Sequence, residues 1–401
     1  MRILVVAKNL PPTSDPESLC TAKLIDAIRG AGDIVDVVTG TATPIVQADR
    51  FHIVAESEHE SFLESAGRRV AGYPETGWGW AGKASRRISS LCNSQDFDCI
   101  YSRGMPFISH VAVWRSKAWK TVPWAAHFSD PWPQTDFWAD PRGSRLRWHR
   151  RIVPGMSGLT FPSQRVEAVC RDQESGVAGL DHQKVLILPH VGRAMSLAAA
   201  PEMPRRHPIR LLHCGSLHGP RRPDVLIQAM AELAIERADG QLGLELHQVG
   251  PVSEVLTEMA DAAGLGHHIF QHGPCDYETS LQRMADADVL LLVENIDAKV
   301  GVYLPSKFVD YIWAGKPIVA LTPSVGTVAD YLGPSYPLRA DPWEVGQVKR
   351  ILEMLVRNPE SVKSALCRVT DLRHEFAPEL IAGRLKCFLE ELCQQRRSVQ
   401  D

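Results

Sequence analysis

The sequence lacks the cysteine spacings that mark disulfide frameworks and structural zinc sites. Its nine cysteines are scattered, their number is odd, and no two of them form a Cys-x-x-Cys pair. Scattered, unpaired cysteines are typical of reduced thiols in a cytoplasmic protein. We therefore expect a cytoplasmic location, no disulfide framework and no metal site.

Long apolar runs and an excess of positive charge are also missing. No stretch of 18 uninterrupted apolar residues occurs, and the first apolar run, in MRILVVAKNLPP, is too short for the core of a signal peptide. We therefore expect neither a membrane-spanning helix nor a secretory leader. The formal net charge of −3 argues against a nucleic-acid partner, because such proteins carry a basic field.

What the sequence does contain is an alternation of short apolar runs and helical patterns, which predicts βαβ units and a parallel sheet. The first unit is a strand at 3–7, a helix that Asp15 caps with Pro16 at its first position, and a strand at 34–38. Further strands are predicted at 99–101, 124–127, 158–161 and 185–188. Residues 40–95 follow no clear pattern.

A second βα series follows the proline-rich stretch AAAPEMPRRHP, which has the composition of an exposed linker. Its strands are predicted at 209–214, 242–249, 269–272, 289–293 and 318–321, and two helices near 343–357 and 377–395 close the chain. We thus predict an α/β fold of two doubly wound, Rossmann-like domains that face a central cleft. The expected divisions are 1–197, the linker 198–208, 209–375, and a C-terminal helix in 376–401 that crosses back to the first domain.

The stretch GVYLPSKFVDYIWAGKPIVAL, residues 301–321, places three polar groups at the start of a helix. Ser306 is the expected cap, and Lys307 adds positive charge where the free amide groups of a helix favour a phosphate. Asp310 lies one turn further on the same face, where a carboxylate suits a pair of sugar hydroxyls. Phosphate followed by ribose is the outline of a nucleoside diphosphate. The alternative is an ordinary capped helix with an exposed Lys–Asp pair.

The loop GSLHGPRRP follows the strand 209–214 at the same predicted sheet edge. Gly215 and Gly219 permit tight turns, and the forked guanidinium groups of Arg221 and Arg222 suit phosphate oxygens. This loop is a second candidate phosphate site. The alternative is a solvated basic loop.

The segment LPSKFVDYIWAGKPIVAL resembles the signature region of retaining GT-B glycosyltransferases of family 4. The resemblance implies the GT-B fold, a nucleotide-sugar donor in the second domain and an acceptor in the first. It places Asp310 where the family binds the donor ribose, and it places Ser306 and Lys307 beside the donor phosphates. Enzymes of this kind generally need no metal or other cofactor, and the nucleoside-diphosphate sugar is a co-substrate.

The resemblance departs from the family pattern in the first acidic position, eight residues before Asp310, where Val302 stands. In the family a glutamate there contacts the transferred sugar. Glu294 or Asp297, just after the strand 289–293, is the expected substitute, and we assign Glu294 to the donor site.

The loop GSLHGPRRP is similar to the family segment whose arginine and lysine hold the diphosphate. Ser216 stands in the place of that arginine, so Arg221 or Arg222 is the expected cation. The resemblance then implies that Gly215, Ser216 and Arg222 bind the donor, while Arg221 acts in catalysis together with Lys307.

In the first half, WAAHFSDPW at 124–132 resembles the family strand that ends in a histidine, with His127 in that position and Asp130 close by. The resemblance makes His127 a catalytic candidate. A single histidine is otherwise often structural.

Together these observations predict a retaining glycosyltransferase of polysaccharide biosynthesis. It would move a sugar from a nucleotide-sugar donor to a saccharide, a lipid-linked glycan or a small molecule. Two other classes stay open: a non-catalytic nucleotide-sugar binder or partner subunit of the same fold, and a sugar-nucleotide epimerase.

The segment RGSRLRWHRRIVPG, residues 142–155, surrounds Trp148 with arginines. At helical spacing it could form a basic face with an aromatic anchor that lies on the inner face of an anionic membrane, which would suit a lipid-linked acceptor. We state peripheral membrane contact through residues 142–152 as a hypothesis. The alternative is a solvated charged helix.

Overall fold

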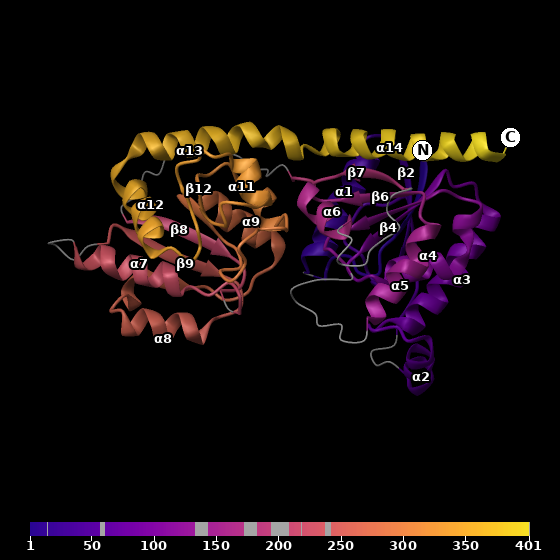
Figure 1. The fold of residues 1–401 in the computed structure, drawn as a ribbon, viewed down its shortest axis with the longest axis horizontal. Coiled ribbons are helices and arrows are strands. Elements are labelled where there is room, and N and C mark those ends of the chain that lie inside the picture. Colours follow the sequence, from indigo (N-terminus) through magenta and orange to yellow (C-terminus); the bar gives the residue numbers. More distant parts are fainter. Residues whose placement is uncertain are drawn as a thin grey trace. The chain divides into compact units, whose positions relative to one another are not determined.

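The computed structural model describes residues 1–13, 15–56, 61–132, 143–171, 183–193, 208–217, 219–236 and 242–400. The chain divides into two compact units (Figure 1). Unit 1 comprises Met1–Val191 and Ala377–Asp401, and unit 2 comprises Gly192–Phe376. Apart from Pro208, the predicted linker 198–208 lies outside the described residues.

In the described part of unit 1, seven parallel strands form one sheet in the order β3-β2-β1-β4-β5-β6-β7. The strands are β1 (Arg2–Val6), β2 (Ile34–Thr39), β3 (Arg50–Ile53), β4 (Cys99–Gly104), β5 (Trp124–Phe128), β6 (Gly158–Phe161) and β7 (Lys184–Ile187). The helices are α1 (Pro16–Gly30), α2 (Phe62–Ala71), α3 (Trp78–Ser94), α4 (Ile108–Ser116), α5 (Ser144–Ile152), α6 (Gln164–Arg171) and α14 (Pro378–Gln400).

Successive side chains of a strand point to opposite faces of the sheet, and the strands here carry apolar side chains on both faces. Helices cover both faces of the sheet and bury these side chains. Ile3 and Val5 belong to the buried cluster that α1 and α14 complete, and α14 contributes Leu385 and Leu389 to it. On the opposite face, α4 approaches β4 closely enough for Ser102 and His110 to share a hydrogen bond of 2.8 Å. The last helix of the chain is therefore part of the core of unit 1.

In the described part of unit 2, six parallel strands form a sheet in the order β10-β9-β8-β11-β12-β13. These strands are β8 (Ile209–Cys214), β9 (Leu244–Val249), β10 (Ile269–Gln271), β11 (Val289–Val293), β12 (Ile318–Leu321) and β13 (Arg339–Ala340). The helices are α7 (Asp224–Ile235), α8 (Glu254–Ala262), α9 (Tyr277–Asp286), α10 (Ser306–Ala314), α11 (Thr327–Leu332), α12 (Val345–Arg357) and α13 (Pro359–Leu372).

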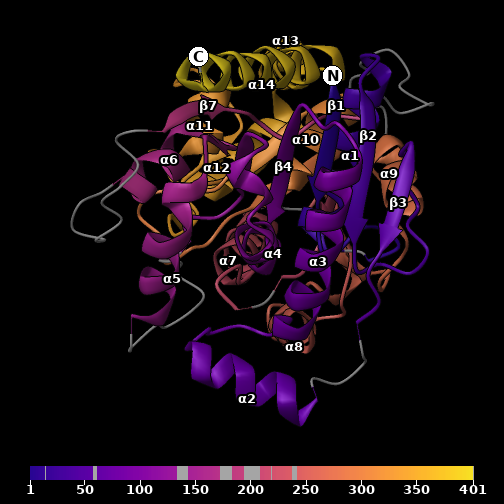
Figure 2. The same cartoon turned by 90° about the vertical axis from the view of Figure 1, so that its right-hand side faces the viewer.

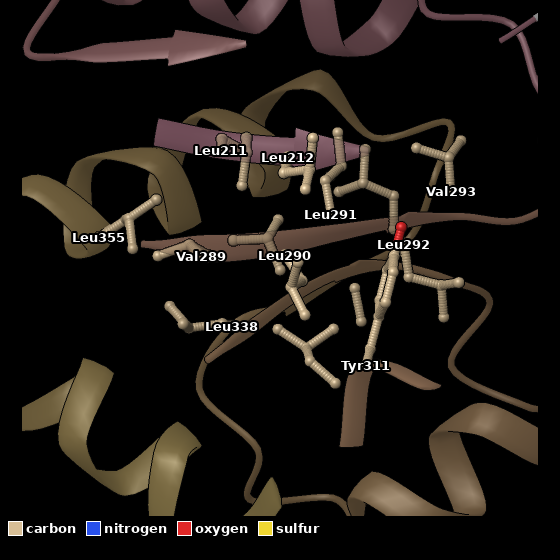
Figure 3. Packing of buried hydrophobic residues seen from close by; sticks show 14 of the residues in the cluster. Leu211, Leu212, Val289, Leu290, Leu291, Leu292, Val293, Tyr311, Leu338 and Leu355 are labelled. Atoms are coloured by element: carbon tan, nitrogen blue, oxygen red, sulfur yellow. The ribbon is translucent and has the colours of Figure 1, made fainter. Parts of the chain in front are cut away.

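The strand β11 is the centre of the core of unit 2 (Figure 3). All five of its residues, VLLLV, are buried, as expected for a parallel strand that is covered on both faces. Tyr311 of α10 is fully buried among them, and its Oη accepts a hydrogen bond of 2.9 Å from the Cys214 amide. The middle of α10 is thereby fixed to the end of β8.

The fold prediction is confirmed: the chain is an α/β protein with two doubly wound parallel sheets. Asp15 caps α1 through the Ser18 amide at 2.9 Å, with Pro16 at the first position, as predicted. Several elements were not predicted, among them β3, α2 and α3 within residues 40–95. Three helices rather than the two predicted ones lie at the end of the chain. The helix that was not predicted is α13, which begins two residues after the end of α12.

No helix among the described residues combines the length and the apolar character that crossing a bilayer requires.

Candidate functional site

The strand order of unit 2 reverses direction between β8 and β11, so the loops after these two strands leave in opposite senses. In doubly wound sheets, ligands bind in the crevice at this point, beyond the carboxyl ends of the strands. The two loops are joined by a hydrogen bond of 2.9 Å from the Ile296 amide to the Pro220 carbonyl oxygen. The predicted phosphate-binding residues lie in these loops and at the start of α10.

Gly215 forms the turn that leaves β8. Its φ of +129° lies in a region that side chains rarely adopt, and its amide donates to the Val249 carbonyl at 2.7 Å. A Cβ at this position would collide with Nζ of Lys307. The lysine ammonium therefore lies directly against the glycine backbone, and a side chain at position 215 would displace it.

Lys307 and Arg221 form a pair of cations at this turn. Burial, together with the neighbouring charge of Arg221, lowers the pKa of Lys307 to about 8. Within the described residues, neither side chain forms an ion pair with a carboxylate. His213 of β8 is fully buried and bonded through Nδ1 to the Leu291 carbonyl at 2.9 Å. Burial and the charge of Lys307 hold its pKa well below the usual value, so the imidazole is neutral and adds no third positive charge to the two cations.

The structure separates the two arginines that the sequence could not rank. Arg222 is half-exposed and pairs with Asp224 at 3.1 Å and with Asp297 at 3.5 Å. Arg221 instead acts electrostatically on Lys307 and on Glu294. Arg221, Lys307 and Glu294 thus form one cluster of interacting charges, whereas Arg222 forms ion pairs on the surface. Ser216 lies half-buried in the turn directly after Gly215.

Glu294 lies buried at the end of β11 and accepts a hydrogen bond from the Thr322 hydroxyl at the end of β12. Burial raises its pKa to about 7, although Thr322 and Arg221 both oppose this shift. The carboxylate also lies against Gly301, where a Cβ would stand 3.1 Å from Oε2. Of the two predicted substitutes for the missing glutamate, Glu294 lies in the cluster, whereas Asp297 is exposed and paired with Arg222.

Val302 lies in the loop that runs from Glu294 to α10. Its carbonyl oxygen accepts a hydrogen bond of 2.7 Å from the Thr327 hydroxyl, and the adjacent Gly301 bridges to Gly326. The backbone at the missing acidic position is thus held in place, and the carboxylate that the cluster contains comes from Glu294.

The prediction that Ser306 caps α10 is wrong. Pro305 is the N-cap, with φ −63° and ψ 129°, and no side chain caps the helix. The fixed φ of proline suits the extended residue at the boundary, so Ser306 takes the first helical position. Asp310 is buried, and its Oδ1 accepts a hydrogen bond of 2.9 Å from the Tyr277 hydroxyl of α9.

In unit 1, His127 lies at the end of β5. Its Nδ1 shares a hydrogen bond of 2.8 Å with Thr160 of β6, while the buried Nε2 has no hydrogen-bond partner among the described residues. Burial and the charge of Arg103 hold its pKa well below the usual value. His127 is therefore a neutral imidazole with an unsatisfied ring nitrogen.

A buried ion pair that the sequence did not predict lies at the carboxyl end of the same sheet. Arg103 of β4 pairs with Glu17 of α1 at 2.9 Å, and the Ser129 hydroxyl also donates to Glu17. Burial raises the pKa of Glu17 to about 7 and that of Asp130 to about 6. Nothing in the sequence distinguishes Glu17 from the acidic residues that are common in the first turn of a helix.

The two doubly wound parallel sheets in one chain have the GT-B architecture, the fold of the glycosyltransferases of known structure to which the chain is similar. The solved structures to which the whole chain is similar include a sucrose-phosphate synthase from Thermosynechococcus elongatus, with 14% identity over 98% of this chain and 99% of that one and a TM-score of 0.70. They also include HepE from Anabaena in complex with UDP and glucose, with 14% identity over 97% of this chain and 99% of that one and a TM-score of 0.66. A trehalose-6-phosphate synthase from Burkholderia multivorans is 13% identical over 100% of this chain and 98% of that one, with a TM-score of 0.64.

No protein-family model matches the chain, and neither does any curated protein sequence.

Proposed function

We propose that the protein is a glycosyltransferase that uses a nucleoside-diphosphate sugar. The observation that carries this proposal is the pair of cations, Lys307 and Arg221, at the turn that Gly215 forms. Among the described residues neither cation forms an ion pair with a carboxylate, so the two adjacent positive charges repel each other, and a diphosphate would relieve that repulsion. The first-turn amides of α10, which no side chain caps, would add further donors to the same anion.

Each residue then has a role toward the donor. Arg221 and Lys307 hold the diphosphate, the backbone at Gly215 and Ser216 approaches it, and Asp310 accepts from the ribose hydroxyls. Glu294 accepts from hydroxyls of the transferred sugar, in place of the glutamate that Val302 replaces. HepE with UDP and glucose, and a trehalose-6-phosphate structure with UDP-2-fluoro glucose, support a donor of this class.

The chemistry that we propose is group transfer without a metal. The bond between the anomeric carbon and the diphosphate oxygen breaks, and its electron pair stays on the oxygen, where the two cations stabilise the growing charge. The oxygen of an acceptor hydroxyl forms the new bond to the anomeric carbon, and its proton passes to the departing diphosphate. We propose retention of configuration, which a study of trehalose-6-phosphate synthase describes for that enzyme. The neutral His127 would accept a hydrogen bond from a substrate hydroxyl through Nε2.

We propose that unit 1 binds the acceptor, a saccharide, a lipid-linked glycan or a small molecule, and that the enzyme acts in the cytoplasm in polysaccharide synthesis. The test is a thermal-shift screen with UDP, GDP and other nucleoside diphosphates, followed by donor-hydrolysis and transfer assays. Ligands that bind the folded state raise its unfolding temperature. A positive shift and release of the diphosphate are expected. Binding without turnover would instead identify a binding protein, and interconversion of the free nucleotide sugar would identify an epimerase.

A further inference from the structure

Helix α2 turns its apolar side chains outward. Phe62, Leu63 and Val70 are 84%, 80% and 90% exposed. At 100° per residue these three side chains lie on one face of the helix. The flank next to this face approaches α3: a Cβ on Gly67, which lies about 40° from Leu63 around the helix, would stand 3.3 Å from the Trp78 indole nitrogen. An ordinary surface helix has the reverse arrangement, with its apolar face toward the core.

The position of α2 is determined by specific contacts at both of its ends. Ser61 and Glu64 form a capping box, with hydrogen bonds of 2.9 and 3.2 Å. At the other end Gly72 takes the left-handed conformation, and its carbonyl accepts from the Trp148 indole at 3.1 Å. Within unit 1, Figures 1 and 2 show α2 at an outer end, with α3 and α5 on the side toward the sheet. The exposure of its apolar face is therefore a property of the fold.

The helices around α2 are strongly basic. Cations number two on α2, three on α3, one on α4 and four on α5, and the only carboxylate within these four fully described helices is that of Glu64. This excess is local, because the whole chain has a net charge of −3. The guanidinium of Arg115 lies 4.4 Å from the Trp78 ring, and that of Arg151 lies 5.2 Å from the Trp148 ring.

Acidic residues near α2 are partly neutralised. Glu75 pairs with Arg145 at 3.3 Å, and Glu56 pairs with Lys8 at 2.9 Å. Positions 58 and 60, also glutamates, lie outside the described residues. A surface that is apolar at its tip and basic at its base is complementary to an anionic bilayer, whose headgroups are negative and whose interior is apolar.

We propose that α2 is a membrane-contact element, which inserts Phe62, Leu63 and Val70 into the surface of an anionic phospholipid bilayer while the surrounding arginines contact the headgroups. This differs from the contact that the sequence predicted through residues 142–152. Trp148, the expected anchor there, is only 4% exposed and supports α2 from within. The proposal is independent of the proposed sugar transfer.

The test is sedimentation of the full-length protein with phosphatidylcholine vesicles that do or do not contain phosphatidylglycerol. The wild type is expected to bind only the anionic vesicles, and less at higher salt, because salt screens surface charges. The triple variant Phe62→Ser, Leu63→Ser, Val70→Ser is expected to lose roughly tenfold or more of its partition coefficient. Its matched control is Ile235→Ser, which removes an 83% exposed apolar side chain from α7 in unit 2.

Two further variants separate insertion from charge. Val70→Trp should add fluorescence that brominated lipid chains quench, and Ile235→Trp should add fluorescence that they do not quench. Arg69→Glu should weaken binding, whereas Arg357→Glu, at an exposed position on α12, should not.

The proposal is overturned if the wild type does not bind anionic vesicles or if the triple variant binds them as well as the wild type does. It is also overturned if brominated lipids quench the added tryptophans of Val70→Trp and Ile235→Trp to the same extent. Self-association of the wild type that the triple variant loses, without vesicle binding, would identify a second copy of the chain as the occupant and would also overturn it.

Discussion

Among single residues, the division of roles between Arg221 and Arg222 is directly testable. Arg221→Ala and Lys307→Ala should each weaken UDP binding by about 10–100-fold, since hydrogen bonds to charged groups contribute about 1.5–3 kcal/mol. Arg222→Ala is the matched control, because Arg222 is already paired with Asp224 and Asp297. Isothermal titration calorimetry measures all three variants. Equal losses in Arg221→Ala and Arg222→Ala would contradict the assignment of the diphosphate contact to Arg221.

The depressed pKa of Lys307 predicts that UDP binding depends on pH. With a pKa of about 8 in the free protein, Lys307 loses its charge as the pH rises through 8. A bound diphosphate favours the charged form, so UDP affinity should fall above pH 8, by up to about tenfold per pH unit. Binding near pH 8 should also take up a proton, which calorimetry in buffers of different ionisation enthalpy detects. Lys307→Arg, which stays charged, should remove this pH dependence.

The pKa of Glu294 is raised rather than lowered, and it predicts that the stability of the folded protein depends on pH. Since its pKa rises from 4.5 to about 7 on folding, the protonated form is favoured in the native state, and this stability is lost as the pH rises from 4.5 through 7. Glu294→Gln removes that loss. The stability of the variant relative to the wild type should therefore increase by about 3 kcal/mol between pH 4.5 and 8. Urea unfolding at several pH values measures the difference, and a constant difference would contradict the raised pKa.

At this scale the sequence predicted part of the site. Lys307 and Arg221 could be named as candidates because their loops lie beyond the carboxyl ends of apolar strands at one sheet edge, and Glu294 was named from the family resemblance. The Glu17–Arg103 pair could not, because it joins residues 86 positions apart whose contact depends on the packing of α1 against β4. The predicted cap of α10, Ser306, is one residue too late in the chain. Serine is common at the N-cap, but here the fixed φ of Pro305 makes proline the boundary residue.

Among elements, the turn after β8 is the one on which the site depends most. Gly215→Ala forces a side chain into a positive φ and against Lys307, which should cost on the order of 1–3 kcal/mol and weaken UDP binding. Gly219→Ala is the matched control in the same loop, because its φ is also positive, at +60°, but no atom lies within 4 Å of the added Cβ. Equal UDP affinity in the two variants would contradict the close approach of Lys307 to Gly215.

Central strands such as β1, β8 and β11 could be predicted because burial on both faces makes them continuous apolar runs. The edge strand β3 is short and half-exposed, so it carries no such run. Helix α2 was missed for a related reason: its apolar residues face solvent, and its capping box alone does not distinguish it from a loop. Sequence patterns that place apolar residues toward the core therefore do not detect a helix whose apolar residues are exposed.

For the whole molecule, unit 2 is one continuous segment and should fold by itself. A fragment of residues 192–376 contains every donor-site residue that we propose, from Gly215 to Asp310. We expect it to unfold cooperatively in urea and to bind UDP with the affinity of the full chain. A soluble, folded fragment without UDP binding would show that the donor site needs residues of unit 1.

Unit 1 has the opposite construction, because α14 joins its core from the far end of the chain. On the ribosome, the first 191 residues therefore emerge without the helix that covers Ile3, Val5 and their neighbours. At about 5–20 residues per second, synthesis of the remaining residues lasts on the order of 10–40 s. During this interval unit 2 can complete its fold, while the first segment exposes the apolar face that α14 will cover. The order of synthesis and the order of folding are thus reversed, and the last 25 residues decide when the N-terminal unit is finished.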